Sequence, residues 1–255
     1  MPEQRFSLAA ETYDKHAFPQ QKLAKQIISF LPKTQPDRLL ELGAGTGQLT
    51  RLLVAQFPHS SIDVIDLSEK MIEYGRALFS NVSCLHWQVA DAETFQATKA
   101  YPLIISSSAL HWVKDLTKTF KTIFNNLEDD GVFVFGLMLK DTLIELQTIR
   151  KEVAPKKAQT HFLPTSEEVI TALKSVGFSI DQTRHRIDTF TYPSATQFLQ
   201  AIHEQGVTGG KTSRDTAPLS RQELQKLIQI YQARFSTDQG VEASYETLSI
   251  RARKT

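Results

Sequence analysis

Apolar and polar residues follow two alternating patterns through the first half of the chain. Short, mostly apolar runs predict strands at residues 38–42, 61–66, 83–89, 101–108 and 132–137. Between them, apolar residues recur every three or four positions and predict helices at residues 48–57, 69–79 and 116–127. Because strands and helices take turns along the chain, the pattern predicts the α/β fold class, with a doubly wound, mainly parallel sheet.

The pattern changes on either side of this stretch. Residues 6–17 and 20–30 predict two helices before the first strand, and Asp129-Asp130-Gly131 predicts a turn before the fifth. Ser166 is the expected N-cap of a later helix that Gly177 ends. The remaining elements are helices at 139–153, 166–176, 194–204 and 221–235 and strands at 178–187 and 245–253. We expect the last two strands to form a hairpin, which makes the last strand antiparallel.

The first predicted strand runs directly into a glycine-rich loop, Glu41-Leu42-Gly43-Ala44-Gly45-Thr46-Gly47. The spacing E-x-G-x-G-x-G differs from the dinucleotide fingerprint G-x-G-x-x-G, whose third glycine lies at the helix that binds the pyrophosphate. S-adenosylmethionine has no phosphate, and its ammonium needs an acidic partner such as Glu41. The loop taken alone is equally consistent with a simple turn between a strand and a helix.

Two further acidic residues follow the second and third predicted strands, at Asp66 and Asp91. Asp66 is placed to accept hydrogen bonds from both hydroxyls of a ribose. It could instead be the N-cap of the next helix, but Ser68 can take that role equally well. Asp91 can accept from an adenine amino group, although a polar turn is the simpler explanation. Acidic residues after three successive strands favour a nucleoside ligand over three unrelated turns.

The fourth predicted strand ends at a stretch in which His111 and Trp112 follow Ser106-Ser107-Ser108. These two side chains lie near the point where ligands bind in open α/β sheets. His111 has two interpretations, a catalytic base or a cover over the ligand, and we favour the cover because Trp112 offers a flat apolar wall. Tyr13 and His16 form either a packing pair or part of the same pocket wall.

The composition restricts the function classes. A formal net charge of +1 gives no general reason to expect nucleic-acid binding. The single cysteine, Cys84, excludes an intramolecular disulfide, and no metal-ligand spacing is present, so we expect no metal. No apolar segment at the start indicates a signal peptide, and no apolar run is long enough to cross a membrane. We therefore expect a cytoplasmic protein with no membrane partner.

Taken together, these residues resemble the class I S-adenosylmethionine-dependent methyltransferases. The resemblance covers residues 36–140 and rests on the glycine loop, Asp66, Asp91-Ala92 and residues 106–112. It implies a Rossmann-like sheet of seven strands with the last one antiparallel and the cofactor over the carboxyl ends of strands one to four. The implied cofactor-binding residues are Glu41, Gly43, Ala44, Gly45, Gly47, Asp66, Leu67, Met71, Asp91, Ala92 and Ser107.

A closer resemblance, over nearly the whole chain, is to the malonyl-acyl-carrier-protein O-methyltransferase family of biotin synthesis. The matching segments are residues 6–14, 110–112, 142–146, 206–208 and 219–224, together with Tyr245. His111 departs mildly from the family pattern, which more often has Gln there, and Val207 departs as well. The resemblance implies a single domain over 1–255, with N-terminal cap helices (1–33), a cofactor-binding core (36–137) and two inserts that form a substrate lid (138–165 and 190–240).

The implied reaction methylates the free carboxylate of a malonyl thioester carried by acyl carrier protein. A carboxyl group is already ionised at neutral pH, so we expect no acid–base residue. The candidates for the substrate pocket are Tyr13, His16, His111, Trp112, Lys140, Arg150 and Arg214. Because carrier proteins are acidic, we expect a basic patch supplied by Arg150, Lys151, Lys156, Lys157, Arg184 and Arg186, against the alternative of a scattered solvated face.

Three rival functions remain open at this point. The nearest is an O-methyltransferase that acts on a free small acid or on a quinone-like intermediate. A second is a cofactor-binding protein without catalytic activity. A nucleic-acid methyltransferase fits less well, because no Asn/Asp-Pro-Pro-Tyr/Phe motif follows the fourth predicted strand.

Overall fold

The structure is a computed structural model that describes residues 17–157, 163–205 and 218–255. The predicted helix over residues 6–17 therefore lies outside the described residues, except for Ala17, as does the glycine-rich turn over 206–210. None of the helices formed by the described residues is both long and apolar enough to cross a membrane.

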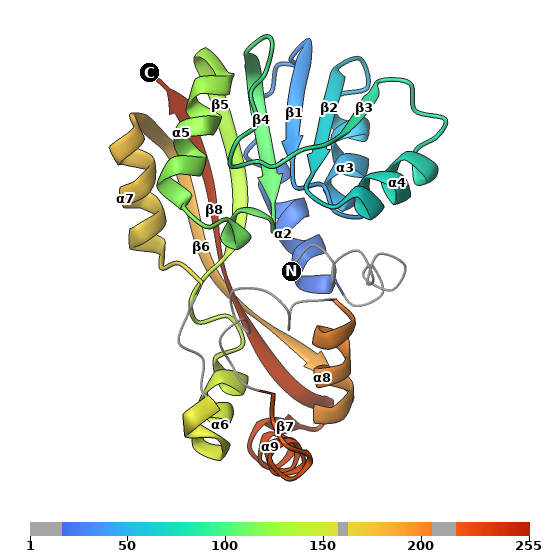
Figure 1. The fold of residues 1–255 in the computed structure, drawn as a ribbon, viewed down its shortest axis with the longest axis vertical. Coiled ribbons are helices and arrows are strands. Elements are labelled where there is room, and N and C mark those ends of the chain that lie inside the picture. The colour runs from blue at the N-terminus through green and yellow to red at the C-terminus, as the bar shows by residue number, and fades with distance from the viewer. Residues whose placement is uncertain (1–16, 158–162, 206–217) are drawn as a thin grey trace. The chain divides into compact units, whose positions relative to one another are not determined.

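The described strands form one mixed sheet in the order β3-β2-β1-β4-β5-β8-β6, and the short β7 pairs with β8 off this path. The first five are parallel, and β8 runs against both of its long neighbours (Figure 1). This arrangement confirms the predicted fold class and the antiparallel last strand. The strands are β1 (Arg38–Leu42), β2 (Ser61–Asp66), β3 (Leu85–Val89), β4 (Tyr101–Ser107), β5 (Leu127–Met138), β6 (Phe178–Tyr192), β7 (Ser236–Thr237) and β8 (Gly240–Lys254).

Helices cover both faces of the sheet, as the doubly wound fold requires. Gly136 of β5 faces one way, and a Cβ added there would lie within 2.9 Å of Leu23 and Ile27 on α2. The neighbouring Phe135 faces the other way, with its ring 5.5 Å from that of Phe120 on α5. The helices are α2 (Phe18–Ile28), α3 (Gln48–Gln56), α4 (Glu69–Leu78), α5 (Leu116–Asn126), α6 (Ile144–Val153), α7 (Ser166–Val176), α8 (Ala195–Glu204) and α9 (Arg221–Phe235), with short 3-10 helices η1 (Leu110–Trp112) and η2 (Pro155–Lys157).

Several predicted boundaries are wrong, each for a local reason. The predicted turn at Asp129-Asp130-Gly131 lies inside β5, where Asp130 has a φ of 61° and the pairing with β4 shifts register. Helix α6 begins at Ile144 and not at residue 139, because Leu143 adopts a left-handed conformation with φ 59°. Strands β6 and β8 are also longer than predicted, with 15 residues each.

Two helices begin with a capping box, in which a hydroxyl and a glutamate satisfy each other's backbone N–H groups. Thr165, and not the predicted Ser166, caps α7, and its partner is Glu168. Ser220 caps α9 in the same way together with Glu223. In both helices the first turn is therefore hydrogen-bonded by residues of the helix start itself.

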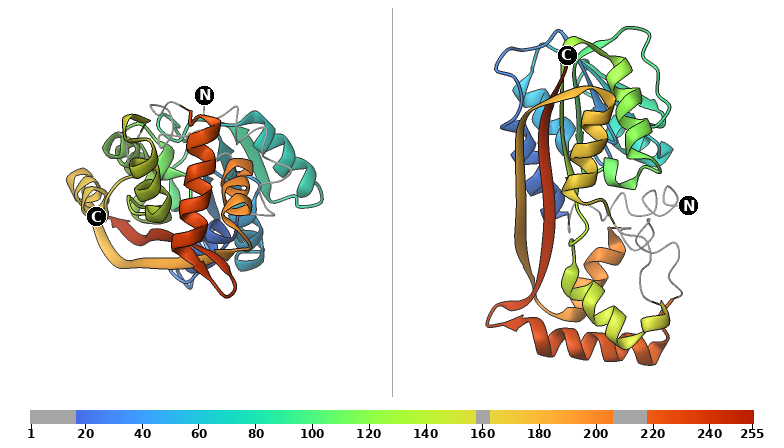
Figure 2. Two further views of the ribbon diagram at one scale, coloured as in Figure 1. Left: turned by 90° about the horizontal axis from the view of Figure 1, so that it is seen from below. Right: turned by 90° about the vertical axis from the view of Figure 1, so that its left-hand side faces the viewer.

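The chain divides into two compact units. The core unit comprises Gln20–Leu137, Thr165–His185 and Leu248–Thr255, and it contains the glycine loop. The insert unit comprises Met1–Pro19, Met138–Pro164 and Arg186–Thr247. Its described part has an aromatic centre, in which the ring of Phe198 lies 5.1 Å from that of Tyr192 and 5.0 Å from that of Tyr231. The helices α8 and α9, which carry Phe198 and Tyr231, are seen from below in the left view of Figure 2.

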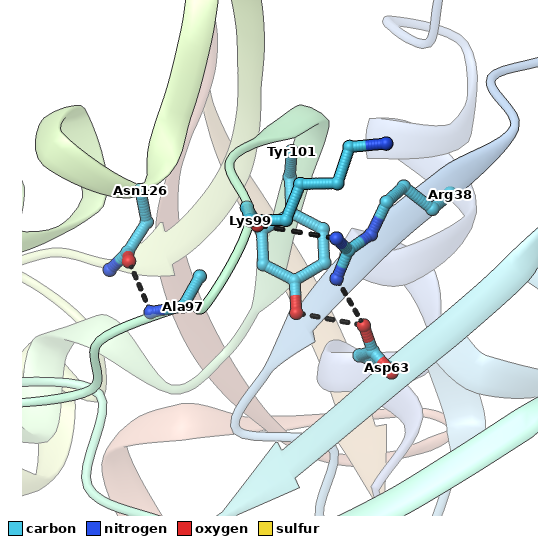
Figure 3. A network of polar contacts seen from close by, with 6 residues as sticks. All are labelled: Arg38, Asp63, Ala97, Lys99, Tyr101 and Asn126. Carbon is cyan, nitrogen blue, oxygen red and sulfur yellow. Dashed lines mark hydrogen bonds and ion pairs between the residues drawn. The ribbon is translucent and has the colours of Figure 1, made fainter.

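A polar network ties together the amino ends of the central strands of the core unit (Figure 3). Arg38 pairs with Asp63 at 2.9 Å and lies 4.0 Å above the ring of Tyr101. The Tyr101 hydroxyl donates to the same Asp63 oxygen at 2.8 Å, and the pKa of Tyr101 is raised to about 12 by burial and by this carboxylate. The network leaves the opposite, carboxyl ends of these strands to the glycine loop.

Candidate functional site

The glycine loop folds tightly over the carboxyl end of β1. Gly43 donates its N–H to Ile65 O at 2.8 Å, which fastens the loop to β2. A Cβ at Gly43 would lie 2.3 Å from the Cβ of Ala109, so no side chain fits there. A Cβ at Gly45 would meet nothing within 4 Å. The loop therefore packs closely on one side and leaves open space beside Gly45, as a ligand that approaches the backbone requires.

Glu41 is buried at the end of β1, with an exposed fraction of 1%. Thr50 Oγ1 donates to Glu41 Oε2 at 2.7 Å, whereas Oε1 is buried with no hydrogen-bond partner. Burial, with a smaller contribution from the nearby charge of Asp66, raises the pKa of Glu41 to about 8 although the hydrogen bond from Thr50 lowers it. A buried carboxyl oxygen without a partner is costly, and a cationic donor from a ligand would satisfy it.

Asp66 at the end of β2 is held by the backbone on both sides. Its Oδ2 accepts from Gly45 N at 2.8 Å and its Oδ1 accepts from Ser68 N at 2.9 Å. Ser68 caps α4 through Met71 N, as predicted. The cap does not need Asp66, whose carboxylate is fixed beside the glycine loop, where a ribose could reach it.

Asp91 follows β3 in a tight turn. Its Oδ1 accepts from Glu93 N at 2.9 Å, and its carbonyl oxygen accepts from Phe95 N at 2.9 Å. Asp91 and Ala92 are both partly exposed, so the turn is open to a ligand. The three acidic residues thus lie at or just after the carboxyl ends of β1, β2 and β3, which are neighbours in the sheet.

The end of β4 holds two serines whose hydroxyl oxygens are buried without a hydrogen-bond partner, Ser107 and Ser108. Ser106, one residue earlier, instead donates to Leu42 O at 2.9 Å. Ser108 also has a φ of 55°, a strained conformation for a residue with a side chain. Sequence reasoning proposed Ser107 alone. The run of three serines after an apolar strand was the available signal for Ser108.

His111 and Trp112 lie together in η1. Their ring centroids are 4.9 Å apart at an interplanar angle of 46°. His111 is buried, with an exposed fraction of 5%, whereas Trp112 is partly exposed. Since Ala109 directly precedes η1 and contacts Gly43, this pair belongs to the same end of the sheet as the glycine loop.

The other predicted site residues fall into three groups. Ala44 and Met71 are buried in the core unit, and Leu67 is half exposed. Lys140 and Arg150 belong to the insert unit, where Lys140 is exposed and burial lowers the pKa of the partly buried Arg150. Tyr13, His16 and Arg214 lie outside the described residues. Within the described part of the chain, no three His, Cys, Asp or Glu side chains form a group suited to a metal ion.

The residues at the carboxyl ends of the strands fit S-adenosylmethionine by their chemistry. Glu41 offers an unpaired buried oxygen for an ammonium, and Asp66 offers a fixed carboxylate for ribose hydroxyls. The open space at Gly45 admits a ligand against the backbone. The assignment of individual residues to individual parts of the cofactor stays a prediction.

Known proteins resemble this chain over nearly its whole length. A malonyl-[acyl-carrier protein] O-methyltransferase of Bacillus anthracis is 27% identical over 99% of this chain and 96% of the relative. The YcgJ protein of Bacillus subtilis has the same fold, with a TM-score of 0.62 at 14% identity over 91% of this chain and 97% of that protein. The N-methyltransferase NodS of Bradyrhizobium japonicum, solved with S-adenosyl-L-homocysteine, has a TM-score of 0.54 at 17% identity. This match covers 91% of this chain and 85% of NodS.

A family model described as a methyltransferase domain matches residues 13–183. That range contains the glycine loop, the three acidic residues, the serines that end β4 and the His111–Trp112 pair. Together, the match and the site chemistry indicate S-adenosylmethionine as the methyl donor. The chain belongs to the methyltransferase-domain family.

Proposed function

We propose that this protein methylates the free carboxylate of a malonyl thioester carried by acyl carrier protein, to give the methyl ester, in an early step of biotin synthesis. The observation that supports this substrate best is the extent of the likeness to a malonyl-[acyl-carrier protein] O-methyltransferase, which spans 99% of this chain and 96% of the relative. The likeness includes the insert unit, where a methyltransferase of another substrate class would be expected to differ.

The core unit would hold the methyl donor. S-adenosylmethionine supplies an electrophilic methyl group on a positively charged sulfur. Glu41 would accept from its ammonium, Asp66 from its ribose hydroxyls and Asp91 from its adenine. These carboxylates lie at the carboxyl ends of neighbouring strands, so the sheet fixes their spacing before the ligand arrives.

No residue of the site needs to move a proton. The attacking carboxylate is ionised at neutral pH, and the new carbon–oxygen bond forms as the carbon–sulfur bond breaks. Opposite charges on carboxylate and sulfonium disappear in this step, so a water-poor site favours the transition state. We assign His111 and Trp112 to the exclusion of water, because both rings lie at the ligand end of the sheet and His111 is buried.

The substrate carboxylate needs hydrogen-bond donors when it leaves water. Tyr13, Lys140, Arg150 and Arg214 remain the candidates from the sequence. The hydroxyl of Ser108 joins them, since it is buried without a partner at the end of β4. A single hydroxyl binds a carboxylate less tightly than a bidentate arginine, which avoids excess stabilisation of the ground state.

The test is methyl transfer from S-adenosylmethionine that carries an isotope-labelled methyl group. Purified protein is offered malonyl-acyl-carrier protein, free malonate and trans-aconitate in separate reactions, and the products are weighed by intact mass spectrometry. We expect one labelled methyl on the malonyl carrier protein, removed by mild base as a methyl ester should be. Methylation of a free acid with no reaction on the carrier protein would refute the proposal.

A further inference from the structure

The charges of the insert unit are strongly segregated. Its helices α6, η2 and α9, called here the basic helices, carry seven cationic and three anionic side chains. The rest of the described insert unit carries two cationic and six anionic side chains. A chain with a formal net charge of only +1 therefore concentrates a local charge of +4 on three short segments.

The basic helices form one surface and not three separate segments. Helices α6 and α9 pack against each other. Lys157 of η2 pairs with Glu223 of α9 at 2.6 Å, and Arg234 near the end of α9 pairs with Glu152 of α6 at 2.7 Å. Arg150 Nε donates to the carbonyl oxygen of Lys157 at 3.1 Å.

All three acidic side chains on the basic helices are already engaged. Glu152 is held by Arg234, and Glu145 accepts from Ser244 N at 3.1 Å. Glu223 accepts from Lys157 and from the backbone of Ser220, and these contacts lower its pKa to about 2. Within the described residues, these three acidic groups therefore form no ion pair with Lys151, Lys156, Arg221 or Lys226.

Four cations on this surface are exposed and have no ion pair within the described residues: Lys151, Lys156, Arg221 and Lys226. Two apolar side chains on the same helices are also exposed, Ile144 at 41% and Leu224 at 42%. A surface with cations of one sign is electrostatically complementary to an acidic partner, and exposed apolar side chains beside it add contact area for such a partner.

From this surface we propose that the basic helices dock the acidic carrier protein that presents the malonyl group, an inference that rests on the proposed function. The surface revises the patch expected from the sequence. Arg186 instead pairs with Asp188 at 3.2 Å, and Arg184 belongs to the core unit, where it lies 5.4 Å from the ring of Phe30. Helix α9 supplies the cations that the sequence analysis did not include.

The test variant carries Lys151→Glu, Lys156→Glu and Lys226→Glu, all exposed side chains outside the cofactor site. The matched control changes three exposed lysines of the core unit by the same charge: Lys25→Glu, Lys33→Glu and Lys99→Glu. Each protein is assayed with malonyl-acyl-carrier protein and with malonyl-pantetheine, which has the same reacting group without the protein. Thermal unfolding and S-adenosylmethionine affinity confirm that each variant is folded.

We expect the test variant to raise KM for the carrier protein on the order of 30-fold at low salt, since clustered charge controls encounter. Turnover of malonyl-pantetheine should stay within about twofold of the wild-type value, because that substrate lacks the carrier protein that would contact the basic helices. The wild type should lose carrier-protein affinity as salt rises, and the test variant should be much less salt-sensitive. Equal effects of the test and control variants, or equal loss on both substrates, would overturn the docking surface.

A binding measurement separates this inference from the proposed function. Carrier protein with an unloaded phosphopantetheine arm is titrated into wild type and test variant by calorimetry. If the wild type fails to methylate malonyl-acyl-carrier protein, the proposed function fails, and this titration still decides the docking surface. Weaker binding by the test variant supports it, whereas no binding to the wild type, or equal binding to both, refutes it.

Discussion

Glu41 should make the stability of the ligand-free protein fall as pH rises. Its pKa is raised from 4.5 to about 8, chiefly by burial, and its Oε1 has no partner. Below pH 4.5 the carboxyl group is protonated in both folded and unfolded protein. As pH rises above that value the unfolded chain loses the proton first, so the unfolded state gains relative stability until the pH passes about 8.

The perturbation that isolates this effect is Glu41→Gln, which keeps the shape and an oxygen that can accept from Thr50. Between pH 4.5 and about 8 the slope is at most about 1.4 kcal/mol per pH unit, which gives an upper bound of about 5 kcal/mol. Relative to Glu41→Gln, the wild type should therefore lose several kcal/mol of unfolding free energy across this range.

The assay is urea unfolding of ligand-free wild type, Glu41→Gln and a control, Glu73→Gln, at intervals from pH 5 to pH 8.5. Glu73 is exposed on α4, so its change should leave the pH profile unaltered. Excess S-adenosylmethionine should flatten the wild-type profile, because its ammonium lowers the pKa of Glu41. Parallel profiles for wild type and Glu41→Gln without ligand would refute the argument.

Four further substitutions test other features of the structure. Gly43→Ala should prevent stable folding, because the new Cβ would lie 2.3 Å from the Cβ of Ala109. Gly45→Ala should lower the stability measured by thermal unfolding by only about 1–2 kcal/mol. Its main effect should be weaker S-adenosylmethionine binding, measured by calorimetry. Tyr101→Phe should lower the free energy of unfolding by about 1 kcal/mol, since Asp63 loses one donor; unchanged stability would mean that the hydroxyl bond is not formed. Ser108→Gly should raise the melting temperature, because glycine adopts a φ of 55° without strain. The same substitution should slow methyl transfer more than the control Ser106→Gly does, while the affinity for S-adenosylmethionine stays equal in the two variants. Equal methyl-transfer rates in the two variants would exclude a substrate role for the Ser108 hydroxyl.

The core of the fold was predictable because its signals are local. The strands at Arg38–Leu42 and Ser61–Asp66 have the predicted limits, since each is a short apolar run bounded by turn residues. Glu41 and Asp66 followed from position alone, because parallel strands that end at one edge bring their last residues together. The helix Arg221–Phe235 has the predicted limits as well.

Features that depend on distant contacts were not predictable. Strands β6 and β8 extend beyond their sequence patterns because strand length is set by pairing between segments far apart in the chain. Helix α6 begins later than predicted because Leu143 is left-handed, and leucine at that position gives no sequence signal for such a conformation. The pairing of Arg38, Asp63 and Tyr101 joins three strands, and the sequence gives no reason to connect them. The strained φ of Ser108 was not predictable either, because it is a property of backbone geometry.

The capping boxes at Thr165 and Ser220 have a consequence for how this enzyme could diverge. Each helix obtains the hydrogen bonds of its first turn from its own opening residues, so its starting point does not depend on what precedes it. Segments upstream of these caps could therefore change in length or composition during evolution without shifting α7 or α9. Such segments are natural places for a lineage to alter acceptor choice, and for an engineer to graft sequences from related enzymes, while the methyl-donor site stays intact.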